Sequence, residues 1–280
     1  MIIDAHTHIF PDDICAHRED YFQGEPAFKL LYESPKARLV TAEDMVRSMD
    51  ENGVDRSVTF GFPWKKEGYF QKNNDYIIDS VLKFPDRLIG LCCVDVDHPA
   101  AAKEVERCLC AGVAGVGELA FYQSGIAPAA LDRLEPIMTL CREKDAPIMI
   151  HTNEPVGHLY PGKTPNTLAQ IYSVAKKFPD NRIIFAHWGG GIFFYTLLKK
   201  EARKTLKNVY YDTAASPFLY EPDIYKVAVS LAGIDKILLG TDYPLIKPDR
   251  YFREMETAGL SDAQRKKISG ENSARLFHLI

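Results

Sequence analysis

Two histidines near the start of the chain have the spacing of metal ligands. His6 and His8 end an apolar run, and side chains two residues apart on a β-strand point to the same face. Two imidazoles on one face of a strand end suit zinc and other divalent transition metals. Taken alone, the pair is equally compatible with two exposed polar residues, so the rest of the sequence has to decide.

Four further residues whose side chains can bind a metal lie at the ends of later apolar runs. They are Glu118, His151, His187 and Asp242. If the runs are parallel strands of a closed barrel, their carboxyl ends meet at one mouth, where barrel active sites are found. Any one of these residues alone could be a structural hydrogen-bonding partner or a turn cap. Their equivalent positions together predict a metal site that also contains His6 and His8.

The elements that would position these residues alternate regularly along the chain. After the first strand, β-rich apolar runs cover residues 57–62, 88–94, 113–119, 147–151, 182–187, 209–213 and 236–240. Helix-like stretches lie between them at residues 74–84, 99–111, 128–144, 165–178, 191–206 and 221–232, and two short helices follow at 261–269 and 271–279. This alternation predicts an α/β fold, a single (β/α)₈ TIM barrel over residues 1–280. An open doubly wound sheet is the alternative, but it often has a glycine-rich turn after its first strand, and none stands here.

The connection after the first strand is unusually long. Residues 11–40 mix charged residues, aromatics, prolines and a glycine without a clear period. Long connections in compact domains usually cover a functional site or contain short helices. We expect this segment to cover the mouth of the barrel. Thr41 then begins a capped helix that ends near Asn52 and Gly53.

The composition sets limits on partners and location. The formal net charge of −4 gives no general attraction to nucleic acid or anionic membranes. The strand pattern begins at residue 2 and no apolar run could span a bilayer, so we expect neither a signal peptide nor a membrane segment. Six cysteines without a secretory signal predict reduced thiols and a cytoplasmic location. The expected partner is a small-molecule substrate, and self-association into a homo-oligomer is left open.

Several motifs occur together in a characteristic order. They are Asp4-Ala5-His6-Thr7-His8, His151, His187, Thr241-Asp242-Tyr243-Pro244 and Asn272-Ser273-Ala274-Arg275-Leu276-Phe277. In this combination the chain resembles the amidohydrolase superfamily, in particular its amidohydrolase-related (amidohydrolase 2) group, over nearly its whole length. The resemblance implies a metal, usually zinc, bound by His6, His8, His151 and Asp242. It implies that His187 is a second-metal ligand, an acid or base, or a substrate-polarising group.

Glu118 departs from the pattern of many binuclear members, which have a carbamylated lysine on the fourth strand. It resembles the metal-dependent deoxyribonuclease branch, in which a glutamate bridges two ions. Because a carboxylate can bridge ions as a carbamate does, one or two divalent ions are expected. Zn²⁺ is the first choice, and Mn²⁺ or another divalent metal is the alternative.

The function expected on this basis is hydrolysis of an amide, ester or lactone bond in a small organic substrate. A metal-bound water that loses a proton near pH ~7 would be the nucleophile. Asp242 would accept that proton and His187 would polarise the scissile bond, so these two are the predicted catalytic residues. Two alternatives use the same scaffold, a non-oxidative decarboxylase of an unsaturated or aromatic carboxylic acid and a deoxyribonuclease-like phosphodiesterase. A metal-stabilised binding protein is the non-enzymatic alternative.

Residues just after the strand ends are candidates for binding the substrate. They are Trp64, Lys65, Tyr122, Asn153 and Trp188. Lys65 would hold a substrate carboxylate or phosphate, although a lysine in an exposed loop is more often only solvated.

Overall fold

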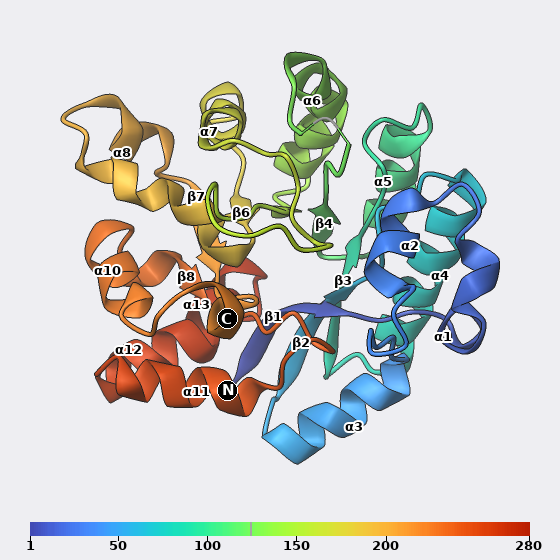
Figure 1. The fold of residues 1–280 in the computed structure, drawn as a ribbon, viewed down its shortest axis with the longest axis horizontal. Helices are drawn as coiled ribbons and strands as arrows, with labels where there is room; N and C mark the ends of the chain where they lie inside the picture. The colour runs from blue at the N-terminus through green and yellow to red at the C-terminus, as the bar shows by residue number, and fades with distance from the viewer. Residues whose placement is uncertain (124) are drawn as a thin grey trace.

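The computed structural model describes residues 1–123 and 125–280, which contain eight strands in one parallel sheet (Figure 1). The strands are β1 (Ile3–His8), β2 (Arg56–Phe60), β3 (Leu88–Cys92), β4 (Gly115–Leu119), β5 (Ile148–Ile150), β6 (Ile183–Phe185), β7 (Val209–Asp212) and β8 (Ile237–Leu238). Neighbours in the sheet follow the chain order from β1 to β8. Each predicted apolar run overlaps one of these strands, so the predicted (β/α)₈ barrel is confirmed.

The sheet closes on itself mainly through the segment that follows β8. The Ala5 amide donates to the Leu239 carbonyl at 2.7 Å, and the His8 amide donates to the Tyr243 carbonyl at 2.8 Å. Thr7 and Tyr243 also form a parallel bridge. These bonds join the first strand to the last part of the barrel, so the carboxyl ends of the strands surround one nearly closed mouth.

Helices surround the sheet on its outside (Figure 1). The longer ones are α3 (Ala42–Asn52), α4 (Glu67–Lys83), α5 (Ala101–Cys110), α6 (Pro128–Glu143), α7 (Leu168–Lys177), α10 (Ile224–Leu231) and α11 (Pro248–Thr257). The shorter ones are α1 (Asp12–Ala16), α2 (Pro26–Tyr32), α8 (Glu201–Thr205), α9 (Ser216–Leu219), α12 (Asp262–Lys266) and α13 (Asn272–Leu276). Turns of 3₁₀ or π type, labelled η, lie at η1 (Arg18–Tyr21), η2 (His187–Leu197), η3 (Ile234–Lys236) and η4 (Lys267–Glu271). The Thr41 hydroxyl accepts a hydrogen bond from the Asp44 amide, as the predicted cap of α3 requires.

Two helical regions differ from the prediction. The helix expected at residues 191–206 is broken, because Trp188 to Gly191 have positive φ angles at its start and Leu198, with ψ 139°, is extended in its middle. Left-handed residues cannot continue a right-handed helix, so regular helix is reached only at α8. The helix α11 is an addition that the sequence pattern did not indicate, and it follows β8.

The long connection after β1 contains α1, η1 and α2, which lie beside α4 in Figure 1. Glu25 ties this segment to the loop after β2, because its buried carboxylate accepts the backbone N–H groups of Lys65 and Lys66, both at 2.9 Å. Phe28 adds apolar contact, with its ring centroid 4.2 Å from that of Trp64. The predicted short helices are therefore present and are docked on the loop that follows β2, and the cover over the mouth stays a prediction.

Alternate strand residues belong to two different apolar cores. One core is drawn from the strands and the C-terminal segment that includes α13, with Val58, Phe60, Met149 and Leu238 among its members. The other combines strand residues with helix residues and lies between the sheet and its helices. The C-terminal segment packs closely against the start of the chain, since a Cβ atom on Gly270 would lie 2.1 Å from the Met1 carbonyl oxygen. Among the described residues, no helix is sufficiently long and apolar to cross a membrane.

Replacement of Phe28 by alanine tests how firmly the first connection is docked. Phe28 is fully buried, so Phe28→Ala should lower the free energy of unfolding by about 3–5 kcal/mol in urea titrations. Leu30 lies on the same helix and is 51% exposed, so Leu30→Ala should change it by less than ~0.5 kcal/mol. Equal effects of the two substitutions would show that α2 is not anchored by its buried face.

Candidate metal centre

The six predicted metal-binding residues lie together at the carboxyl ends of the strands. They are His6 and His8 in β1, Glu118 in β4, His151 after β5, His187 after β6 and Asp242 after β8. Their ligand atoms form three overlapping groups, within each of which all atoms lie within 4.8 Å of one another: His6, His8 and Glu118; His6, His187 and Asp242; Glu118, His151 and His187. The most exposed of the six side chains, that of Asp242, is 19% exposed. The structure therefore brings all six together in a nearly dry cluster.

Three of the four imidazoles are held through their Nδ1 atoms. The pairs are His6 with the Asp212 carboxylate at 2.9 Å, His8 with the Gly61 carbonyl at 3.1 Å, and His187 with the Ala214 carbonyl at 3.0 Å. An acceptor at Nδ1 favours the proton on that nitrogen, which leaves the Nε2 lone pair for another partner. The Nε2 atoms of all three rings face carboxylates of the cluster.

His151 is held in the opposite sense. Its Nε2 atom lies 2.9 Å from the Gly162 carbonyl, and its Nδ1 atom lies 3.0 Å from Glu118 Oε1. Gly162 holds a proton on Nε2, so Nδ1 is the nitrogen that faces the cluster and that would bind an ion in place of its contact with Glu118. All four rings thus present one nitrogen inward and give the other to an acceptor, the arrangement found around protein-bound metals.

The inward nitrogen of His6 shows that the cluster fits a cation. His6 Nε2 is buried and has no hydrogen-bond partner among the described residues. It lies 3.7 Å from both Glu118 Oε2 and Asp242 Oδ1, which is too far for a hydrogen bond. A divalent ion with bonds of about 2.0–2.2 Å to nitrogen and oxygen would satisfy all three atoms. The residues present therefore fit a divalent metal.

The charges of the cluster lead to the same conclusion. Burial opposes protonation of His6, but the carboxylates of Glu118, Asp212 and Asp242 raise the pKa of its imidazole to about 10. Burial likewise opposes ionisation of Glu118 and Asp242, but the neighbouring imidazoles hold the pKa of both carboxyls below their usual values. Buried carboxylates in this number require positive charge beside them. A divalent ion would supply it.

The backbone around Asp242 and His187 is held in an uncommon conformation. Both residues have positive φ angles, 60° and 54°, which are rare outside glycine and frequent at functional sites. The turn that contains Asp242 is bonded to β1, because the Asp242 amide donates to the His6 carbonyl at 2.9 Å. Asp4 is buried and accepts the amide and hydroxyl of Thr241 at 3.0 and 2.5 Å. These bonds fix Asp242 relative to the two histidines of β1.

Comparison with known proteins identifies the family. The model of a family described as Amidohydrolase matches residues 3–279. The chain belongs to this family. The predicted superfamily is thereby confirmed, and the protein is an enzyme of the amidohydrolase superfamily.

The curated relatives of this amidohydrolase are decarboxylases. The chain is 27% identical to the 2-amino-3-carboxymuconate-6-semialdehyde decarboxylase of Dictyostelium discoideum, over 99% of this chain and 91% of that protein. It is 24% identical to the gamma-resorcylate decarboxylase of Polaromonas sp., over 87% of this chain and 90% of that protein. Among solved structures, the 5-carboxyvanillate decarboxylase of Novosphingobium aromaticivorans in complex with manganese has the same fold. Its TM-score is 0.79 at 19% identity, and the match covers 99% of this chain and 96% of that one.

These relatives correct the expected reaction. The sequence-based expectation of amide, ester or lactone hydrolysis is wrong, because the relatives along most of the chain are decarboxylases. The physical reason is that a hydrolase and a decarboxylase of this superfamily use the same ligand types at the same strand ends. The ligand pattern therefore predicts the metal site without choosing between the two reactions.

The five predicted substrate-binding residues of the amidohydrolase lie in different surroundings. Tyr122 is next to the cluster, with its ring centroid 6.0 Å from that of His151. Trp64 and Trp188 are fully buried, and their indole N–H groups donate to Asn73 and Ser216. The side chain of Asn153 accepts two hydrogen bonds from Thr164, and Lys65 is exposed. Their roles in substrate binding stay predictions.

Two residues near the cluster were missed from the sequence. Asp212 is fully buried at the end of β7, where its carboxylate accepts from His187 N and Ala214 N in addition to its bond with His6. Its place at a strand end, like those of the six ligands, was a signal that could have revealed it. Tyr32 lies in the long first connection. Burial raises the pKa of its hydroxyl, and the carboxylates of Asp242 and Glu118 add to this effect.

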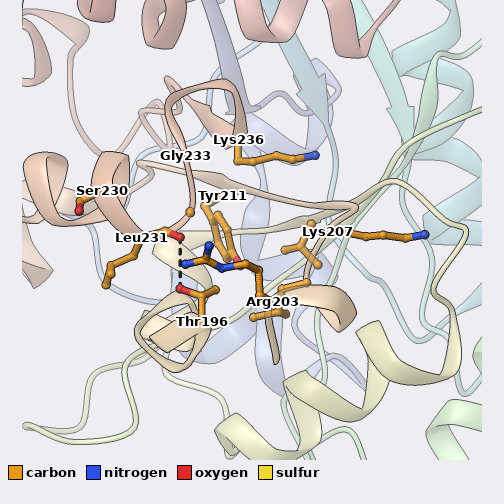
Figure 2. Close-up of a pocket in the computed structure, with 11 residues that line it drawn as sticks. Thr196, Arg203, Lys207, Tyr211, Ser230, Leu231, Gly233 and Lys236 are labelled. Atoms are coloured by element: carbon orange, nitrogen blue, oxygen red, sulfur yellow. Dashed lines mark hydrogen bonds between the residues drawn. The ribbon is translucent and has the colours of Figure 1, made fainter. Parts of the chain in front are cut away.

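A separate pocket of about 330 Å³ lies away from the cluster (Figure 2). Lys207 and Lys236, which line it, lie two residues before β7 and one residue before β8, so the pocket is at the amino ends of these strands. Figure 2 shows the amino groups of both lysines extending away from Arg203. None of the six cluster residues lines this pocket. Donor atoms, rather than cavity size, therefore locate the candidate site.

The substitution Asp212→Asn tests the support of His6. It keeps the size of the side chain but removes the charge that holds Nδ1–H of His6, so the affinity for Mn²⁺ or Zn²⁺ should fall about 10- to 100-fold. Metal titration of the chelator-treated protein measures this. The control is Asp86→Asn, at a residue whose side chain is 93% exposed, and it should leave the affinity unchanged. Wild-type affinity in Asp212→Asn would argue against the assignment of His6 as a ligand.

Proposed function

We propose that this amidohydrolase is a divalent-metal-dependent, non-oxidative decarboxylase of an aromatic or unsaturated carboxylic acid. The choice of reaction is carried by one observation, that relatives aligned along 87% and 99% of the chain are decarboxylases of gamma-resorcylate and 2-amino-3-carboxymuconate-6-semialdehyde. The converging ligand atoms at the barrel mouth support a metal-dependent mechanism. Such a reaction needs no redox cofactor, because the carbon keeps the electron pair of the broken bond.

We propose one Mn²⁺ ion, in place of the zinc expected from the sequence. Two solved decarboxylases with this fold contain manganese, and carboxylate ligands suit this metal while imidazoles suit several others. The ligands would be His6, His8, His151 and Asp242, with Glu118 beside them. When bound, the ion would supply positive charge that binds the anionic substrate. A single ion leaves His187 free for proton transfer.

His187 is the proposed proton donor. Loss of carbon dioxide leaves an electron pair on the substrate carbon, which must take up one proton. Burial opposes protonation of His187, but Glu118 and Asp242 raise the pKa of its imidazole. The ring is oriented by the Ala214 carbonyl at Nδ1, and Nε2 lies 3.4 Å from Glu118 Oε1. His187 would therefore be protonated on both ring nitrogens, and its Nε2 proton would pass to the carbon as the carboxylate leaves. Asp242 would stay ionised as a metal ligand.

Aromatic side chains near the cluster suit a flat substrate. The rings of Tyr122 and Phe62 are nearly parallel, with centroids 6.0 Å apart, and Tyr32 lies 6.2 Å from Phe62. Aromatic faces of this kind stack on planar rings and conjugated chains. Tyr122, a predicted substrate-binding residue, is the proposed wall beside His151, and Tyr32 would contribute from the first connection.

Carbon dioxide release tests the reaction. The protein loaded with Mn²⁺ should release one carbon dioxide per product from at least one of 2,6-dihydroxybenzoate, 5-carboxyvanillate and 2-amino-3-carboxymuconate-6-semialdehyde. Removal of metal with a chelator should abolish the release, and added Mn²⁺ should restore it. Metal analysis should give one ion per chain. Ester or lactone cleavage without any carbon dioxide release would contradict the proposal.

The variant His187→Gln tests the proton donor. It removes a proton that the imidazole would supply, so kcat should fall about 10²- to 10⁴-fold with the metal content unchanged. The control is His98→Gln, since His98 accepts the Ala100 amide before α5, away from the cluster. Loss of metal from His187→Gln, or two ions per wild-type chain, would instead indicate that His187 is a ligand.

A further inference from the structure

The acceptor that orients His151 differs from those of the other imidazoles. The carbonyls that hold His8 and His187 belong to Gly61, which directly follows β2, and to Ala214, two residues after the end of β7. Strands of the sheet hold these two carbonyls in place. Gly162, by contrast, is eleven residues beyond His151 in the connection between β5 and α7. Its position depends on how that connection is folded.

Buried amide side chains hold together the two ends of this connection, near His151 and near Thr164. Asn153 Oδ1 accepts the amide and the hydroxyl of Thr164 at 2.8 and 2.7 Å. Asn166 Nδ2 donates to the His151 carbonyl at 3.2 Å. Residues 155–159 between them are exposed, so these bonds alone do not account for the position of Gly162.

The amino group of Lys163 holds the rest of the connection together. Lys163 follows Gly162, and its side chain is only 9% exposed. Its Nζ atom lies near three oxygens, Glu154 Oε1 at 2.7 Å, the Val156 carbonyl at 2.6 Å and the His158 carbonyl at 3.4 Å. The Tyr160 hydroxyl donates to the other carboxylate oxygen of Glu154 at 2.8 Å. An ammonium has three N–H donors, so this connection uses all of them.

We propose that Lys163, paired with Glu154, is a positioning residue for the metal ligand His151. It holds the Gly162 carbonyl where that oxygen accepts Nε2–H of His151, and it thereby leaves Nδ1 for the ion. The inference rests on the proposed metal role of His151. In the part of the chain that the structure describes, Lys163 Nζ bonds to Glu154, Val156 and His158 and to none of the six cluster residues, so its effect passes through Gly162.

Metal affinity measures this effect directly. In Lys163→Met the alkyl chain is kept and the three hydrogen bonds are lost, so Mn²⁺ should bind about 10- to 100-fold more weakly. Lys72→Met is the matched control, because Lys72 also contacts a carboxylate and a tyrosine, those of Asp13 and Tyr21, but near no metal ligand. Isothermal titration of Mn²⁺ into the chelator-treated proteins should give the control a wild-type affinity. Lys163→Arg, which keeps charge and donors, should recover most of the loss.

A second readout does not depend on metal. Nitrogen-15 NMR of the metal-free protein should show a protonated, hydrogen-bonded Nε2 on the His151 ring in the wild type. In Lys163→Met the proton on Nε2 should be partly lost, because Glu118 would then favour the tautomer with its proton on Nδ1. Adding Glu154→Ala to Lys163→Met should weaken Mn²⁺ binding no further, because the two residues act as one unit.

The outcomes separate this inference from the proposed function. An unchanged affinity and an unchanged tautomer in Lys163→Met would overturn the positioning role, even if the melting temperature fell. If the wild type bound neither Mn²⁺ nor Zn²⁺, the proposed function would fail, and the tautomer comparison alone would decide the role of Lys163. If Lys163→Met folds like the wild type but binds Mn²⁺ more weakly, the positioning role is supported. If the wild type then releases no carbon dioxide, only the proposed reaction is contradicted.

Discussion

The centre depends on four imidazoles that each have one ring nitrogen held by an acceptor outside the cluster. A neutral imidazole has one donor and one acceptor nitrogen, so a protein acceptor at one nitrogen decides which face is offered to a ligand. Here the acceptors are a carboxylate from β7 and carbonyls that follow β2, β5 and β7. No single element builds the site. Its geometry is correct only when these segments have reached their final positions around the barrel.

The same arrangement explains why several carboxylates can lie in a site with little access to water. Carboxylates at Glu118, Asp212 and Asp242 are each within reach of an imidazole, and none is left among apolar groups alone. Asp4 illustrates the opposite case. It accepts hydrogen bonds mainly from Thr241, and burial raises the pKa of its carboxyl to about 7. Neighbouring carboxylates thus have different proton affinities because one group faces imidazoles and the other faces a hydroxyl and amides.

Much of the fold and of the ligand set could be predicted because both follow the regular alternation of apolar strands and helices along the chain. Apolar runs mark the strands, and a polar residue at the end of a run marks the mouth, as for His151 and Asp242. The broken helix after His187 could not be predicted, since the φ angle of Trp188 depends on its tertiary surroundings. Nor could the reaction, because the ligands serve hydrolysis and decarboxylation alike. The predictions of a cytoplasmic location and of a single domain stay predictions, and self-association stays open.

The seam that joins the two ends of the barrel has a consequence for synthesis on the ribosome. Strand β1 is made first, yet one of its edges bonds to the backbone of Leu239 and Tyr243, more than two hundred residues later. Until that late segment emerges, a strand edge that carries two of the histidines lacks its partner. Unpaired edges invite pairing with other chains. A nascent chain of this protein would therefore stay vulnerable to aggregation until its final stretch is translated, and chaperones that shield early strands should matter most during that interval.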